Sequence, residues 1–228
     1  MPATTIGLLL FPRMTQLDLT GPYEVFTKLP DARVLLLWKT LEPVEADTGL
    51  RMLPYATLHD HPPLDIVCVP GGPGVNVLME DADVLDWLRR QASHARYVSS
   101  VCTGALVLGA AGLLRGRRAT THWNYRDLLA SFGAIPTPER VVRDGNLFTG
   151  GGVTAGIDFA LTMVAELAGA AMAQAIQLQI EYAPAPPFDA GSPDTAPPDV
   201  LRHVRGATAA TRAQREAIVA RAALRLGD

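Results

Sequence analysis

Residues 97–114 read "YVSSVCTGALVLGAAGLL", and this stretch decides the fold. Its first five residues are rich in β-branched side chains and predict a short buried strand, while Thr103 to Leu114 form an apolar pattern typical of a helix. Cys102 lies between the two. A nucleophile on a sharp turn from strand to helix is lifted clear of the sheet, and a glycine two positions later lets the backbone fold tightly beneath it. The arrangement Cys102-Thr103-Gly104 therefore predicts a nucleophile elbow.

The start of this helix bears on the acidity of the thiol. Amides in the first turn of a helix have no partners within the helix, and together with the helix dipole they stabilise negative charge. We therefore expect the pKa of Cys102 to be lowered. The alternative is that Cys102 is a small buried hydrophobic residue, as most free cysteines are. Cys68 lies within an apolar strand with no helix start beside it, so we expect it to be buried and inert.

Short apolar runs and helical patterns alternate over the first half of the chain. The expected strands are residues 4–11, 33–40, 64–70 and 97–101, and the expected helices are residues 17–29, 81–95 and 103–114. Nearly continuous hydrophobic strands separated by helices indicate a mostly parallel sheet that is covered on both faces. The sequence therefore predicts an open α/β domain.

The remaining segments complete this domain. Residues 42–58 lack helical periodicity and predict a small hairpin or an irregular excursion, and residues 140–152 predict two strands joined at Asp144-Gly145. Helices are expected at 152–169, 171–182 and 200–226. Residues 183–199 are rich in proline and should be an extended segment that wraps the surface. We find no repeat and no second domain, so residues 1–228 are expected to form one domain.

Composition narrows the classes of partner. The chain has 228 residues, 48% of them hydrophobic, and a net charge of -3 without a run of Lys or Arg. This argues against nucleic acid or an anionic membrane as a partner and favours small molecules. The apolar run from Ile6 to Phe11 is too short for a signal peptide or a membrane span, so we expect a cytoplasmic protein. No metal site is expected, because no Cys or His pair shows ligand spacing.

Ligands of open α/β sheets bind outside the carboxyl ends of the strands, so the residues that follow each strand are the candidates for a site. Three places stand out, namely Asp18, the "PGGPG" run at residues 70–74, and Cys102. Asp18 suits either an acid/base role or an N-cap of the following helix. His122 could partner the thiol, but we favour a capping or backbone-bonding role. The candidates for an apolar pocket or for dimer contacts are Val153, Gly151, Trp123, Tyr182 and Phe188.

Five segments together resemble a known family. They are "SVCTGALVLGAAGLLRGRRATTHW", "DLTGPYEVF", "CVPGGPGVNVLMED", "FTGGGVTAGIDFAL" and "IEYAPAPPF". The chain resembles the isocyanide hydratases of the ThiJ/PfpI (class I glutamine amidotransferase-like) superfamily, from about Ile6 to Phe188. The resemblance implies a flavodoxin-like three-layer sandwich, a homodimer, and a lyase that hydrates isocyanides to N-substituted formamides without metal or organic cofactor. It also implies that Cys102 is the nucleophile and Asp18 the acid/base, with the backbone amides of Gly72 and Thr103 facing the developing charge.

The residue types fit this chemistry. The terminal carbon of an isocyanide must be protonated as sulfur attacks it, so a thiolate and a proton donor are needed together. Attack gives a thioimidate on Cys102, and the carboxylate of Asp18 then activates a water. A donor role near neutral pH requires the pKa of Asp18 to rise from about 3.9, which burial and a neighbouring anionic sulfur would both promote.

Two alternatives stay open at this point. A glyoxalase or deglycase-like activity on reactive carbonyls would use the same elbow, although a Glu is usual at the acid position there and this chain has Asp18. A non-catalytic ligand-sensing domain is also possible, because AraC-type regulators carry a similar domain. Such regulators need a further helix-turn-helix region, whereas only about one helix follows Asp199. The protease-like relatives carry His directly after the nucleophile, and Thr103 at that place argues against peptidase activity.

Overall fold

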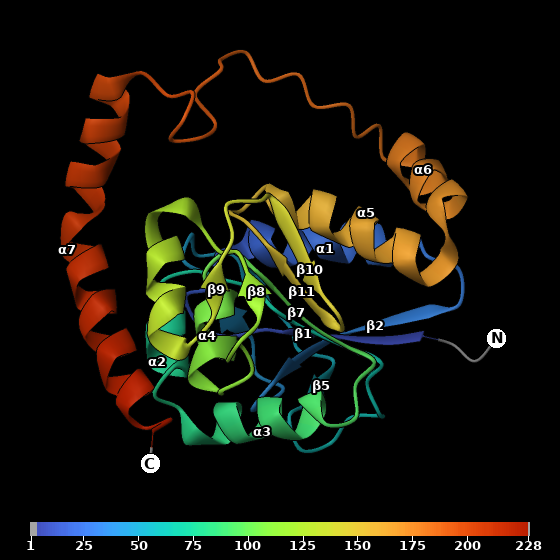
Figure 1. Cartoon of the computed structure of the whole chain (residues 1–228). Helices are drawn as coiled ribbons and strands as arrows, with labels where there is room; N and C mark the ends of the chain where they lie inside the picture. Colours follow the sequence, from blue (N-terminus) through green and yellow to red (C-terminus); the bar gives the residue numbers. More distant parts are fainter. Residues whose placement is uncertain (1–3, 228) are drawn as a thin grey trace.

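The computed structural model describes residues 4–227, and a mostly parallel sheet lies at its centre (Figure 1). In the described part of the chain this sheet has seven strands in the order β10-β11-β7-β6-β1-β2-β5. Their bounds are β1 Thr4–Leu9, β2 Ala32–Trp38, β5 Ala56–Thr57, β6 Ile66–Val69, β7 Tyr97–Val101, β10 Val141–Asp144 and β11 Leu147–Gly150. Only β10 runs antiparallel to its neighbour, β11. The carboxyl ends of β1, β6, β7 and β11 therefore meet at one edge.

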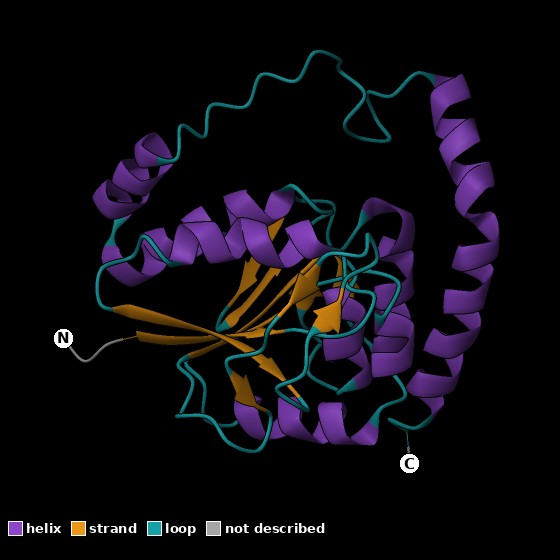
Figure 2. Ribbon diagram, turned by 180° about the vertical axis from the view of Figure 1, so that it is seen from behind, coloured by secondary structure: helices purple, strands orange, loops and turns teal. Residues whose placement is uncertain are grey.

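Helices cover both faces of the sheet. Their bounds are α1 Gln16–Phe26, α2 Val75–Leu78, α3 Ala82–Ala92, α4 Gly104–Ala110, α5 Ala155–Ala168, α6 Ala170–Gln179 and α7 Pro198–Leu224, with a 3-10 helix η1 at Trp123–Phe132. The helices α1 and α5 pack together on one face, and α3 and α4 lie on the other (Figures 1 and 2). This is the three-layer α/β sandwich that the sequence predicted.

Two local predictions need refinement. The irregular region at 42–58 holds the hairpin of β3 (Val44–Glu45) and β4 (Arg51–Met52), and β5 after it joins the edge of the main sheet beside β2. In the second hairpin Asp144 pairs with Leu147. Gly145 and Asn146 therefore form the turn, one residue later than predicted, and Gly145 has the positive φ of 59° that such a turn requires. A further small parallel pair, β8 (Arg118–Ala119) and β9 (Ile135–Pro136), flanks η1.

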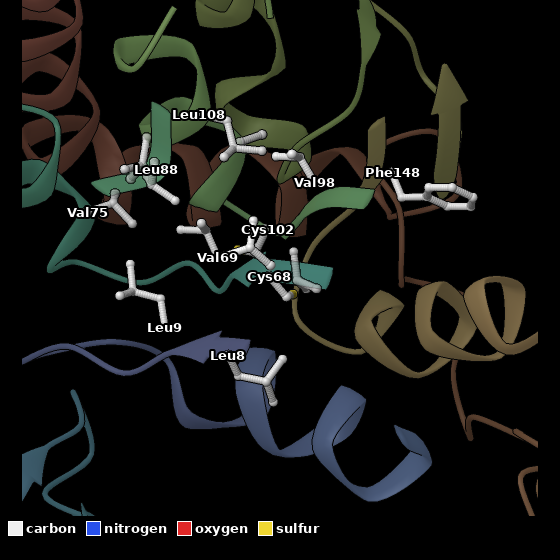
Figure 3. Packing of buried hydrophobic residues seen from close by; sticks show 14 of the residues in the cluster. Leu8, Leu9, Cys68, Val69, Val75, Leu88, Val98, Cys102, Leu108 and Phe148 are labelled. Atoms are coloured by element: carbon white, nitrogen blue, oxygen red, sulfur yellow. The ribbon is translucent and has the colours of Figure 1, made fainter. Parts of the chain in front are cut away.

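The core follows from the composition of the strands. Every residue of β6 and β7 is buried, as expected of central parallel strands covered on both faces. Figure 3 shows Cys68 and Cys102 among the buried apolar side chains of this core, with Val69 nearby. The largest fully buried side chains include Trp87, Phe26 and Phe159.

The proline-rich segment 183–197 is mostly exposed and arcs over one end of the molecule into α7 (Figure 1). Helix α7 then packs against η1 and α4, and its Ile218, Val219 and Ala222 are buried in the common core. Helix α7 therefore shares a core with η1 and α4. Among residues 4–227, no helix combines the length and the apolar character that crossing a membrane requires.

Candidate active site

Cys102 lies at the sharp bend between β7 and α4. Its φ of 54° is in the left-handed region, which is unfavourable for a residue with a side chain. Neighbouring segments hold the bend. The amide of Cys102 donates to the carbonyl of Gly151 at 2.8 Å, and the hydroxyl of Thr121 donates to the carbonyl of Cys102 at 2.6 Å. The predicted elbow is therefore present, and contacts from two other loops fix its geometry.

The glycine two positions after the cysteine is required by a close approach. A Cβ at Gly104 would lie 2.0 Å from the carbonyl oxygen of Val69 at the end of β6. Any side chain at this position would collide with the backbone of the neighbouring strand. The role predicted for this glycine from the sequence is confirmed.

Asp18 lies in the first turn of α1 and is fully buried. Its Oδ2 accepts a hydrogen bond from the amide of Gly71 at 2.9 Å, whereas Oδ1 has no hydrogen-bond partner of good geometry within residues 4–227. The N-cap of α1 is Thr15, so the capping alternative for Asp18 is wrong. The residue reaches the edge of the sheet because α1 starts directly beside the loop that follows β6.

The electrostatics of Asp18 and Cys102 are linked. Burial raises the pKa of Asp18 to about 7, while hydrogen bonds from Cys102 and from the Gly71 amide oppose this rise. Burial, and then the negative charge of Asp18, raise the pKa of the Cys102 thiol, while the backbone amides of Val153 and Thr103 oppose this rise. The expected lowering of the thiol pKa is wrong, because desolvation outweighs the helix start. One negative charge shared by the pair is more favourable than two, so the two groups titrate together.

The backbone amides differ in part from expectation. The amide of Thr103 faces the sulfur, as expected, and so does the amide of Val153. The amide of Gly72 instead donates to Oγ1 of Thr103 at 3.0 Å, so it does not point at the sulfur. The amide of Gly72 turns away from the sulfur because Thr103 follows the cysteine and its hydroxyl oxygen accepts that amide. Val153 supplies the second amide, since the glycine run before it brings α5 close to the elbow.

A cleft of about 360 Å³ opens beside the elbow. Its lining includes Thr121, His122, Trp123, Arg126, Pro138, Glu139, Arg140, Gly151, Gly152, Val153, Thr154, Ala155, Gly191, Ser192, Pro193 and Asp194. Thr121, Gly151 and Val153 all contact Cys102, and about 5% of the cysteine remains exposed. The cleft therefore reaches the residues that contact the elbow, although neither Cys102 nor Asp18 is part of its lining.

The pocket candidates separate into two groups. Val153, Gly151 and Trp123 line the cleft, as predicted. Tyr182 does not line it, because its hydroxyl donates to Oδ2 of Asp158 at 2.9 Å. Phe188 is 79% exposed in the proline-rich segment, so it lines neither a pocket nor the core.

His122 and Cys68 behave as the plainer interpretation predicted. His122 is the N-cap of η1, and its Nδ1 accepts from the amide of Asn124 at 3.3 Å. Burial, followed by the charges of Arg215 and Arg126, lowers the pKa of His122 to about 4, so the ring is neutral near pH 7. Burial raises the pKa of the Cys68 thiol to about 12, so this thiol remains protonated.

One residue near the site was missed by the sequence reasoning. Arg215 on α7 is only 3% exposed, and its Nη2 donates to the carbonyl of Gly72 at 3.2 Å. It is one of several arginines in α7, and its spacing does not distinguish it from the exposed ones. Only the packing of α7 against the body shows which arginine turns inward.

A cysteine elbow beside a buried carboxylate, at the edge of a parallel sheet in a three-layer sandwich, defines the class of protein. The chain belongs to the DJ-1/PfpI family, whose family model matches residues 4–166. Within this family it is similar to the isonitrile hydratase of Pseudomonas putida, with 62% identity over 224 residues, 98% of this chain and 98% of that protein.

Two further proteins are similar to this chain over most of its length. The crystal structure of a ThiJ/PfpI family protein from Pseudomonas syringae superposes with a TM-score of 0.93 at 45% identity, covering 96% of this chain and 91% of that one. The HTH-type transcriptional regulator GbdR of Pseudomonas aeruginosa is 32% identical over 189 residues, 78% of this chain but 50% of the regulator. The regulator alignment thus leaves half of that protein unmatched.

Proposed function

We propose that this protein is an isocyanide hydratase, a lyase that adds water to an isocyanide and releases an N-substituted formamide. The observation that carries the proposal is the contact between a buried carboxyl with a pKa of about 7 and the thiol of a nucleophile elbow. A carboxyl of this kind holds its proton near neutral pH and can donate it. The similarity to an isonitrile hydratase over 98% of both chains supports the same chemistry.

The reaction uses the shared proton of Asp18 and Cys102. The sulfur attacks the terminal carbon of R-NC while Asp18 transfers its proton to that carbon, which gives the thioimidate R-N=CH-S-Cys102. The carboxylate then takes a proton from a water whose oxygen adds to the same carbon. Asp18 passes this proton to the nitrogen and then takes the hydroxyl proton of the adduct, while the C–S bond breaks with its electrons returning to sulfur. R-NH-CHO leaves, and the pair returns to one thiolate and one protonated carboxyl. The overall change is the addition of one water.

The amides of Thr103 and Val153 stabilise the anionic sulfur before attack and after its expulsion, because both face it at the start of a helix. The cleft accommodates the substituent R. Trp123, Pro138, Val153 and Pro193 give it apolar surface, and Glu139, Arg140 and Asp194 give it polar surface. Burial of the reacting pair keeps bulk water from competing for the donor proton.

The test mixes the purified protein with an aromatic isocyanide and follows the formamide by absorbance, with mass spectrometry to detect a Cys102 adduct. Formation of formamide by the native protein and none by Cys102→Ala is the expected result. Absence of formamide together with turnover of methylglyoxal would contradict the proposal and favour the carbonyl alternative. The sensing alternative has less support, because the regulator relative matches at lower identity and over half of its own length.

We further propose that the protein is a homodimer, with a cytoplasmic location. Leu178 on α6 and Phe188 in the proline-rich segment are 82% and 79% exposed, and Val200 and Val204 on α7 are also exposed. Large apolar side chains exposed along consecutive segments of the chain are typical of an interface. Sedimentation of the native protein and of Leu178→Glu tests this, and a native monomer would contradict it.

A further inference from the structure

The guanidinium of Arg215 is buried beside the reacting pair without a carboxylate partner. The side chain is 3% exposed, and among residues 4–227 no Asp or Glu lies within salt-bridge distance of it. In contrast, Arg212 and Arg221 on the same helix form salt bridges with carboxylates nearer the surface. Burying an unpaired cation is costly, so its position is informative.

Neutral groups hold this cation in one orientation. Nε donates to Oδ1 of Asn76 at 2.8 Å, and Nη2 donates to the carbonyl of Gly72 at 3.2 Å. The guanidinium lies 4.3 Å from the centre of the Tyr125 ring, within range of a cation–π interaction. These contacts orient Arg215 and leave its charge unneutralised.

The same contacts connect Arg215 to the site. Gly72, whose carbonyl it binds, donates its amide to Oγ1 of Thr103, the residue after the nucleophile. The preceding Gly71 donates its amide to Asp18. Arg215 therefore braces the loop that touches both the elbow and the carboxyl, from a helix that packs along the side of the body (Figure 2).

The geometry points to Arg215 as a positioning residue whose buried positive charge favours the singly ionised form of the Asp18–Cys102 pair. The inference rests on the proposed function, because it assigns the pair as the reacting groups. Helix α7 lies outside residues 4–166, to which the family model extends, so this cation is an addition to the shared domain.

The groups that bear on the charge of the Asp18–Cys102 pair come from several elements. Asp18 on α1 faces the thiol, and Asp47 in the turn between β3 and β4 adds a negative charge that acts on Asp18. Arg215 on α7 interacts with the anionic form of Cys102. Tyr125 and His122 on the side of η1 face Arg215, and Arg126 faces His122. Since His122 is neutral near pH 7, the negative charge opposite Arg215 is that of the pair.

The test measures the rate at which iodoacetamide alkylates Cys102 as a function of pH, with peptide mass spectrometry to assign the modified cysteine. The variants are Arg215→Met and Arg215→Gln, which remove the charge, and Arg215→Lys, which keeps it. Arg221→Met is the matched control, since Arg221 lies on the same helix and pairs with Glu80 at the surface. Circular dichroism and the melting temperature report folding for each.

We expect the midpoint of the alkylation profile to rise by about one pH unit in Arg215→Met and Arg215→Gln, with a roughly fivefold slower reaction at pH 7. The midpoint should change much less in Arg215→Lys and not at all in Arg221→Met. Equal midpoints in the native protein and a folded neutral variant would overturn the inference. So would the failure of both neutral variants to fold, which would assign Arg215 a structural role. Alkylation needs no isocyanide turnover, so a failure of this test can be told apart from a failure of the proposed function.

Discussion

The backbone amide of Gly71 donates a 2.9 Å hydrogen bond to Oδ2 of Asp18, and so ties the loop after β6 to the first turn of α1. A side chain at residue 71 would not fit, because its Cβ would lie 2.7 Å from the same oxygen and 2.5 Å from the amide nitrogen of Thr103. This bond holds the carboxyl against the elbow. It lowers the pKa of Asp18 less than burial raises it, so the carboxyl keeps its proton up to about pH 7.

Replacing the carboxyl should remove most of the activity. Asp18→Asn keeps the size and an acceptor for the Gly71 amide but has no acidic proton, so kcat/KM for an isocyanide should fall at least about a hundredfold. Steady-state kinetics of formamide formation measure this. Full activity in the asparagine variant would exclude Asp18 as the proton donor.

The same substitution should change how stability depends on pH. The pKa of Asp18 is about 7 in the folded chain and about 3.8 when exposed, so between these values unfolding releases a proton. The stability that this proton gives the native protein is present below about pH 4 and is lost as the pH rises to 7. Above pH 7, Asp18→Asn should be more stable than the native protein, by an amount on the order of a few kcal/mol. Urea denaturation at pH 5 and pH 8 measures the difference, and identical pH slopes in the two proteins would count against the raised pKa.

The two cysteines should differ completely in their effect on turnover. Cys102→Ala should show no turnover and no adduct while its circular dichroism spectrum stays native, because the change removes the proposed nucleophile and only one buried sulfur atom. Cys68→Ala is the matched control in the neighbouring strand and should keep its activity at a modest cost, on the order of 1 to 2 kcal/mol. Turnover that survives in Cys102→Ala would show that another group is the nucleophile.

Two glycines should respond in opposite directions to the same change. Gly104→Ala places a Cβ 2.0 Å from the Val69 carbonyl, so it should lower the free energy of unfolding by several kcal/mol or prevent folding. Gly206→Ala lies in α7 with no atom within 4 Å of the new Cβ, and should stabilise by up to about 1 kcal/mol. Thermal denaturation of both variants is the measurement, and a stable Gly104→Ala protein would be incompatible with the described elbow.

His122 should give the protein a second pH dependence, of opposite sign. Its pKa is about 4 in the folded chain and 6.5 when exposed, so the unfolded chain takes up a proton as the pH falls between these values. This residue therefore makes the protein less stable as the pH falls from about 6.5 to 4. His122→Asn retains an N-cap oxygen for Asn124 and removes the titration, so the loss between pH 7 and pH 5 should be smaller. An unchanged loss would mean that His122 is solvated.

The sequence was sufficient for the elbow and the sandwich. Continuous apolar strands separated by helices specify a parallel sheet covered on both faces, and the spacing Cys102-Thr103-Gly104 specifies the tight bend after β7. Asp18 and Cys102 could be placed together because both follow parallel strands whose carboxyl ends meet at one edge. The apolar periodicity of each strand and the Cys-Thr-Gly spacing are local signals, because each depends on residues near one another in the chain.

Only the tertiary structure decided which groups surround the thiol and how they set its charge. The chain pattern suggested a lowered thiol pKa, whereas packing desolvates Cys102 beside a buried carboxyl and raises it. The choice of the Val153 amide over that of Gly72, and the inward position of Arg215 more than one hundred residues further along, depend on contacts between distant segments. Burial and the distances between such segments are properties of the assembled layers, and no local pattern of residues encodes them.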